Sequence, residues 1–169
     1  MKKSILIIFT LFSALYVKAQ SEFKMSPEGF SGRIELEVPG KTSVQLHDLA
    51  KSWVLDKHEI TIAEDNGSVL TFEGTVDELI AINAMGRMPQ KTKYTVQMTF
   101  TDSGYTFLLS SIKYYHQPSG TWIDPKLESA KSFYNKKGEL KSQYKFYPEI
   151  VTYFNNLHSD FSQYVKSRQ

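Results

Sequence analysis

Residues 94–115 constrain the fold more than any other stretch, because two long runs with a strand-like pattern flank a turn. In the first run, residues 94–101, apolar or aromatic side chains alternate with threonine and glutamine. This two-residue period is typical of a strand with one buried and one polar face. Asp102, Ser103 and Gly104 then supply turn-forming residues. The stretch therefore predicts an antiparallel β-hairpin.

The return strand, residues 105–115, carries large side chains on both faces, so the turn length decides which of them are buried. A three-residue loop places Leu108, Ile112 and Tyr114 in the core. A two-residue turn at Ser103-Gly104 buries the opposite row instead. With the three-residue loop, the row outside the helix-covered core becomes the candidate ligand-binding site and consists of Tyr105, Phe107, Leu109, Lys113 and Tyr115.

An aromatic row outside the core needs a cover. The cover could be the chain between residues 117 and 147, a second copy of the protein, or a ligand. The segment itself offers four apolar side chains for this purpose: Trp122, Ile123, Phe133 and Tyr134. Self-cover or dimerisation is favoured over a ligand, because large apolar side chains are more often buried against other protein side chains than kept exposed for a ligand.

Two amphipathic helices are expected to cover the sheet. The first follows the alternating strand 33–38 and the Pro39-Gly40 break, and the second runs from Pro148 towards the carboxyl end. The apolar face of the first helix consists of Leu46, Leu49, Ala50, Trp53 and Val54, and that of the second consists of Ile150, Phe154, Leu157, Phe161 and Tyr164 or Val165. Trp53 is expected to be a core residue, because it lies on an apolar helix face.

A second hairpin is predicted between residues 59–63 and 68–75, because Asn66-Gly67 supplies the positive φ angles of a tight turn. Residues 77–91 can form either a short helix or an excursion that rejoins the sheet at Lys93.

The amino-terminal 20 residues match a secretory signal peptide, with Lys2 and Lys3 before an apolar stretch and cleavage expected after Ala19 or Gln20. The apolar stretch of about 12 residues is too short for a membrane span, which needs about 20. Without cysteine the chain has no acceptor for a lipid anchor. We therefore expect a soluble periplasmic or secreted protein with no stable membrane span.

Residues 21–32 are expected to be a flexible lead-in, and residues 33–169 a single α+β domain.

Removing residues 1–20 deletes three lysines and no acid, so the formal charge changes from +2 to −1. A near-neutral exported domain lacks the positive surface that binds nucleic acid. The absence of cysteine also excludes disulfides, thiol nucleophiles and cysteine-bound metals.

No catalytic, metal or cofactor motif is found. No G-x-S-x-G elbow occurs, and Glu35 and Glu37 are two carboxylates of the kind that any polar strand face carries. His47, His58 and His158 lack a second ligand at helical spacing, so all three are expected to be exposed. No cofactor or metal is expected.

Several of these runs resemble a known family. The order VPGKT, LAKSW, ITIAEDNGSVLTFEGTV and YTVQMTFTDSGYTFLLSSIKYY is similar to a secreted Bacteroidota domain family of unknown function with a TATA-binding-protein-like fold. The resemblance covers about residues 33–115, with Trp53, the turn 64–67 and the tyrosine-rich hairpin as markers. It implies a curved antiparallel sheet in the order β-α-β-β-β-β-α, with both helices on one face. That fold is best known for binding DNA, which export and the negative charge argue against.

These observations favour an exported, non-catalytic module of the cell envelope that binds a protein, an apolar ligand or a second copy of itself. One alternative is an envelope hydrolase with a site between the sheet and residues 117–147. Another is a structural envelope component that has neither a ligand nor a reaction.

Overall fold

The computed structural model describes residues 22–83 and 87–168, so the predicted signal peptide lies outside the described part of the chain. The strands are β1 (Lys24–Ser26), β2 (Gly29–Ser31), β3 (Arg33–Glu37), β4 (Ile60–Asp65), β5 (Val69–Asn83), β6 (Arg87–Thr101), β7 (Gly104–His116) and β8 (Thr121–Ile123). The helices are α1 (Ser43–Leu55), α2 (Tyr147–Lys166) and the 3-10 helices η1 (Leu127–Phe133) and η2 (Ser142–Tyr144).

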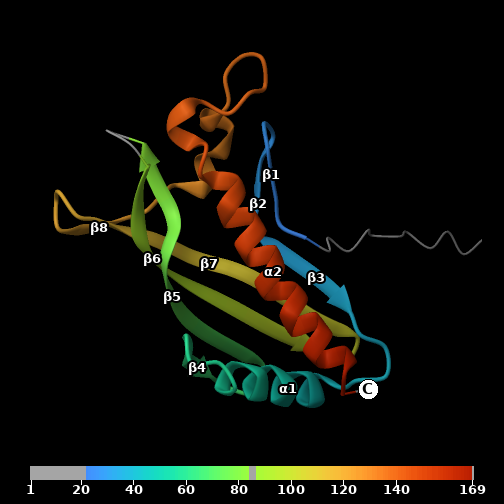
Figure 1. Ribbon diagram of the computed structural model, residues 1–169. Coiled ribbons are helices and arrows are strands. Elements are labelled where there is room, and N and C mark those ends of the chain that lie inside the picture. The colour runs from blue at the N-terminus through green and yellow to red at the C-terminus, as the bar shows by residue number, and fades with distance from the viewer. Residues whose placement is uncertain (1–21, 84–86, 169) are drawn as a thin grey trace, which may run out of the picture.

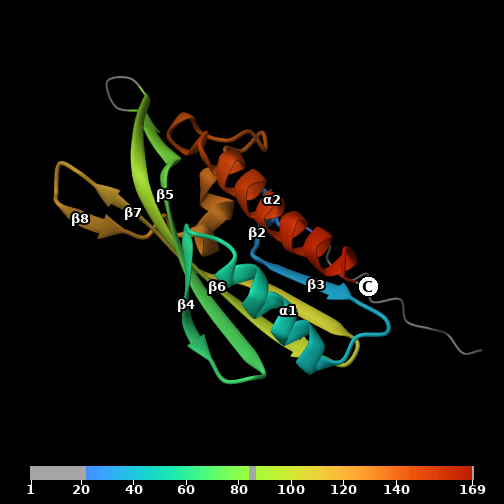
Figure 2. The ribbon, with the colours of Figure 1, turned by 60° about the horizontal axis from the view of Figure 1, so that its bottom comes forward.

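The main sheet is antiparallel, with the strand order β3-β7-β6-β5-β4, and β8 pairs with β7. Both long helices lie on one face of this sheet, as Figures 1 and 2 show. The predicted α+β class and the order β-α-β-β-β-β-α are confirmed by β3, α1, β4 to β7 and α2. Within the described residues the opposite face carries neither long helix, and we call it the open face.

Helix α1 begins with a capping box, in which the Thr42 hydroxyl accepts from the Gln45 backbone and the Gln45 side chain accepts from the Thr42 backbone. Trp53 is 2% exposed and packs against Phe72 and Phe161, with ring centroids 5.7 and 5.2 Å away. Its indole nitrogen donates a hydrogen bond to Asp160 at 2.9 Å, so α1 and α2 are joined. The prediction of Trp53 as a core residue is confirmed.

The hairpin between β6 and β7 has a two-residue turn, because Thr101 pairs with Gly104. The three-residue loop was therefore the wrong choice near the turn. Gly104 also has a different role from the one expected: a Cβ atom there would lie 2.0 Å from the Leu36 carbonyl oxygen. Close approach to β3, and not a left-handed turn conformation, requires glycine at this position.

A β-bulge changes the register halfway along β7. Val96 pairs with Leu109 and Thr95 pairs with Ser111, so Ser110 is the additional residue, and its hydroxyl donates to the Thr95 carbonyl at 3.1 Å. Since one extra residue reverses the faces, the register predicted for the three-residue loop holds beyond the bulge, where Tyr94 pairs with Ile112. Before the bulge the burial predicted for the two-residue turn holds, although that turn lies at Asp102-Ser103 and not at Ser103-Gly104.

Three of the five candidate ligand-binding residues therefore lie in the core. Tyr105, Phe107 and Leu109 are 3%, 0% and 9% exposed on the helix-covered face, and their predicted position outside the core is wrong. Beyond the bulge Lys113 is exposed and Tyr115 is half-buried. The cause is the combination of a two-residue turn with a bulge.

Residues 77–91 form no helix in the part that the structure describes. They continue β5 and β6 as a hairpin arm in which Ile80 pairs with Gln90 after a second register shift. Leu79 and Ile80 are buried. The strand excursion, and not the helix, was the correct alternative.

Residues 22–31 are packed, which corrects the expectation of a flexible lead-in. Strands β1 and β2 pair with each other, and Phe23 is 1% exposed against Phe107 and Phe154, with ring centroids 6.0 and 6.1 Å away. The Asn155 side chain binds both the amide and the carbonyl of Phe23, at 2.7 and 3.1 Å. Two three-residue strands are too short to show a period in the sequence.

Most of the segment between residues 117 and 147 packs beside the helices, and only β8 reaches the open face, where Trp122 contacts Tyr115. Helix η1 contacts β2, and Phe133 packs against Tyr144 and Tyr147 with ring centroids 4.4 and 4.3 Å away. The Tyr147 hydroxyl donates to the Pro125 carbonyl. Phe133 is buried, as a covering side chain would be, but its ring contacts lie on the helix side and not over the predicted row of β7.

Replacing Phe107 with alanine should lower the free energy of unfolding by about 3–5 kcal/mol, because the ring is fully buried among other aromatic rings. Urea denaturation followed by circular dichroism measures the change. Leu108→Ala is the matched control on the open face and should cost about 1 kcal/mol or less. Equal losses in the two variants would contradict the register described above.

Candidate functional site

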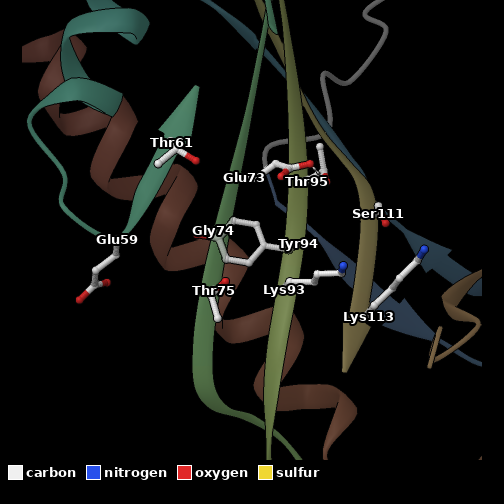
Figure 3. Close-up of a pocket in the computed structure, with 10 residues that line it drawn as sticks. All are labelled: Glu59, Thr61, Glu73, Gly74, Thr75, Lys93, Tyr94, Thr95, Ser111 and Lys113. Atoms are coloured by element: carbon white, nitrogen blue, oxygen red, sulfur yellow. Dashed lines mark hydrogen bonds between the residues drawn. The ribbon is translucent and has the colours of Figure 1, made fainter. Parts of the chain in front are cut away.

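A groove of about 370 Å³ lies on the open face (Figure 3). Strands β4 to β7 contribute its walls, and Glu59 lies at one end. Its lining residues are Glu59, Thr61, Glu73, Gly74, Thr75, Lys93, Tyr94, Thr95, Ser111 and Lys113. This volume is within the range of small-molecule binding sites.

Strand pairing arranges the polar side chains of the groove in two rows. The first row runs across the sheet through Thr61, Glu73, Thr95 and Ser111, and the second through Thr75, Lys93 and Lys113. The Thr95 hydroxyl donates to a Glu73 carboxylate oxygen at 3.3 Å. The groove therefore combines hydroxyl groups, two ammonium groups and a hydrogen-bonded carboxylate.

The strands beneath the groove are held in place by Tyr94. Its ring covers Gly74, where a Cβ atom would lie 2.4 Å from the tyrosine oxygen, and its hydroxyl lies 3.1 Å from the Tyr153 hydroxyl on α2. Burial raises the pKa of Tyr94 above its usual range, so the hydroxyl stays protonated. A rigid support of this kind keeps the groove side chains in register.

Lys93 and Lys113 lie directly opposite each other on neighbouring strands. Figure 3 shows both amino groups pointing to the same side of the groove. Like charges in directly opposed positions destabilise a sheet. Within residues 22–83 and 87–168 no salt bridge joins either lysine to a carboxylate, although the charge of Lys113 contributes to a lowered pKa at Asp124.

Aromatic side chains adjoin the lysine pair. The Lys93 ammonium lies 4.5 Å from the centroid of the Trp122 ring, in a cation–π contact. Trp122 in turn makes an edge contact with Tyr115, with ring centroids 5.5 Å apart. The indole remains 38% exposed, so the aromatic pair adds a partly apolar surface next to the two charges.

Of the five predicted ligand-binding residues, the structure brings only Lys113 and Tyr115 to this part of the open face. Sequence reasoning missed Glu73 and Lys93. It assigned Trp122 to cover the predicted row, and Trp122 does contact Tyr115 of that row. The alternating polar positions of residues 93–97 were the available signal, because they mark the solvent side of a strand whose other side is buried.

Two of the three histidines expected at the surface are buried. His47 and His158 are 7% and 6% exposed, whereas His58 is exposed as predicted. His47 Nε2 lies 2.7 Å from Asp65, which also pairs with Lys51 at 2.8 Å. The hydrogen bond from Lys51 is the main cause that lowers the pKa of Asp65 to about 2.

His158 lies on α2 with Nε2 at 3.0 Å from the Tyr105 hydroxyl. Burial lowers its pKa to about 4, with a smaller effect from Lys166, so the imidazole is neutral at pH 7. Across the described part of the chain, no three histidine or acidic side chains are grouped closely enough to hold a metal ion.

A second groove, of about 310 Å³, lies where the hydrolase alternative predicted a site, and Asp124 and Glu128 line it. Partial burial raises the pKa of Asp124, but hydrogen bonds from the backbone and side chain of Lys126 outweigh this effect and lower it. A general acid needs the opposite shift. Glu35 and Glu37, the two carboxylates of the polar strand face, both lie on β3, and Glu35 pairs with Arg33 at 2.7 Å.

No protein-family model and no curated protein matches this chain. Two solved structures share its architecture. A DUF4468 family protein from Bacteroides ovatus ATCC 8483 superposes with a TM-score of 0.57 at 12% identity, over 87% of this chain and 89% of that chain. A TBP-like protein from Parabacteroides distasonis ATCC 8503 superposes with a TM-score of 0.56 at 16% identity, over 79% of this chain and 90% of that chain.

The class defined by these likenesses is the TBP-like fold, in which a curved antiparallel sheet carries helices on one face. The predicted resemblance to Bacteroidota proteins of unknown function with this fold is confirmed. At these identities the likeness concerns the fold, so a function for the groove must be argued from its own side chains.

The free energy of unfolding should fall by about 2–3 kcal/mol as the pH decreases from 6.5 to 4, because of His158. The folded state keeps this imidazole neutral down to a pKa of about 4, whereas the unfolded chain binds a proton below about 6.5. Its contribution is therefore complete above pH 6.5 and is lost as the pH falls towards 4. Urea unfolding at several pH values measures the slope.

The His158→Gln variant should have a flatter pH dependence in this window, and His58→Gln, at an exposed histidine, should keep the native slope. An unchanged slope in His158→Gln would show that another group causes the acid sensitivity.

Proposed function

We propose that the protein is an exported, non-catalytic binding module that holds an anionic ligand in the groove of the open face. The observation that carries this proposal is the direct opposition of Lys93 and Lys113 on an exposed part of the sheet. An anionic group between the two ammonium groups would relieve their repulsion and accept charge-assisted hydrogen bonds from both.

The orientation of Lys93 supports this proposal. Its ammonium is held over Trp122 on β8, so part of its conformational freedom is already lost before a ligand arrives. A side chain that is oriented in advance loses less entropy on binding. The contact between the hydroxyls of Tyr94 and Tyr153 also holds the strands beneath Lys93 in place before a ligand binds.

The chemistry of the groove favours binding over catalysis. Its hydroxyl and ammonium groups donate hydrogen bonds, and the one carboxylate with a described hydrogen bond, Glu73, accepts from Thr95. Ser110, beside the groove, donates its hydroxyl to a backbone carbonyl and has no general base as its acceptor.

A nucleic acid is disfavoured as the anionic ligand. Glu59 and Glu73 line the same groove and would repel a continuous phosphate backbone. The charge of −1 expected after signal-peptide removal provides no long-range attraction. A ligand with one or a few anionic groups is compatible with two lysines between acidic neighbours.

The exported location rests on residues 1–20, which lie outside the described part of the chain. Among the described helices, none is long and apolar enough to cross a membrane. We propose the periplasm or the extracellular space as the location of the mature protein.

Charge reversal at either lysine should abolish most of the binding to anionic polymers. Isothermal titration of the purified protein with polygalacturonate and with polyglutamate measures the affinity. For whichever polymer binds the native protein, Lys113→Glu should lower the affinity at least 10-fold. Lys137→Glu makes the same charge change at an exposed turn and should bind normally. The proposal fails if neither polymer binds, or if both variants lose affinity equally.

Export should remove the first 19 or 20 residues. Amino-terminal sequencing of the protein recovered from the envelope or the medium of an expressing bacterium should therefore start at Gln20 or Ser21. Recovery in the cytoplasm with an intact amino terminus would contradict the exported location.

A further inference from the structure

The aromatic pair next to the lysines narrows the class of ligand. Trp122 is one of the few large apolar side chains exposed in the described structure, and Tyr115 contacts it edge to face. Indole and phenol rings of this kind offer an apolar surface with a polar rim, and they pack on molecules that have both characters. The C–H face of a sugar ring is such a surface.

The hydroxyl groups of the groove supply a second feature. Thr61, Thr95 and Ser111 lie in one row across β4, β6 and β7, together with the Glu73 carboxylate. A hydroxyl both donates and accepts hydrogen bonds, and a carboxylate accepts them. Such a set complements the hydroxyl groups of a saccharide, each of which also donates and accepts.

The pairing of β6 argues against a peptide as the ligand. Lys93 and Thr95 pair with β5 on one side and with β7 on the other, so the backbone of β6 is already used in the sheet. A peptide that binds to a sheet by strand addition needs a free edge. Recognition above β6, where Lys93 and Thr95 lie, therefore depends on side chains, and these match hydroxyls and one anionic group.

We infer that the ligand is an acidic oligosaccharide, with a uronic-acid carboxylate between Lys93 and Lys113 and a sugar ring against Trp122. The hydroxyl row would then contact the neighbouring sugar unit. This inference rests on the proposed anion-binding function of the same groove and adds the chemical class of the ligand.

The test compares three probes on the purified protein by isothermal titration: uronic-acid trisaccharides (galacturonic, mannuronic and guluronic), the neutral galactose trisaccharide, and triglutamate. At least one uronic trisaccharide should bind 10-fold or more tightly than both other probes. Trp122→Ala should weaken its binding by at least 5-fold, and Trp122→Phe should retain most of it. Leu55→Ala removes an exposed apolar side chain on α1 and should have no effect.

The outcomes separate this inference from the proposed function. Equal or tighter binding of triglutamate, lost in Lys113→Glu, overturns the saccharide class and leaves anion binding intact. Equal binding of the neutral and the uronic trisaccharides overturns the role of the lysine pair. Absence of binding by all probes, or saccharide binding that is unchanged in Trp122→Ala, overturns the inference.

Discussion

The β-bulge at Ser110 determines which side chains of β7 face the helices and which face solvent. Before it, Tyr105, Phe107 and Leu109 point into the core, and after it Lys113 and Tyr115 point to the open face. A strand without the bulge would keep one parity throughout and place Lys113 on the same face as Phe107. The lysine pair of the groove and the aromatic packing beneath α2 both depend on this one extra residue.

Packing on the helix side joins segments that are far apart in the chain. Phe107 contacts Phe23 from the amino-terminal hairpin and His158 from α2, and Asn155 binds the backbone of Phe23. Because this face is occupied by the protein itself, the large aromatic rings of the hairpin are used for stability. The open face carries mainly polar side chains, together with Leu108 and the aromatic pair Tyr115 and Trp122.

The fold shared with the two solved structures, one of them described as TBP-like, accounts for an exposed sheet but not for its chemistry. In this chain the exposed sheet carries two opposed lysines, a row of hydroxyls and an exposed indole. Of the carboxyls that could act as catalytic acids, Asp124 has a lowered pKa and Glu35 is paired with Arg33. We propose that this combination holds a polar, anionic ligand.

The sequence by itself determined the α+β class, the helix faces around Trp53 and the two hairpins, because local periodicity and turn residues are short-range properties. It also indicated the Tyr94 and Ile112 pairing. Only the tertiary structure decided the face of each residue in β7, the burial of His158 and the packing of Phe23. A bulge exchanges the two faces of a strand without a sequence signature of its own. The burial of a single side chain depends on neighbours that can lie more than 50 residues away, as the contact of Tyr105 with His158 shows.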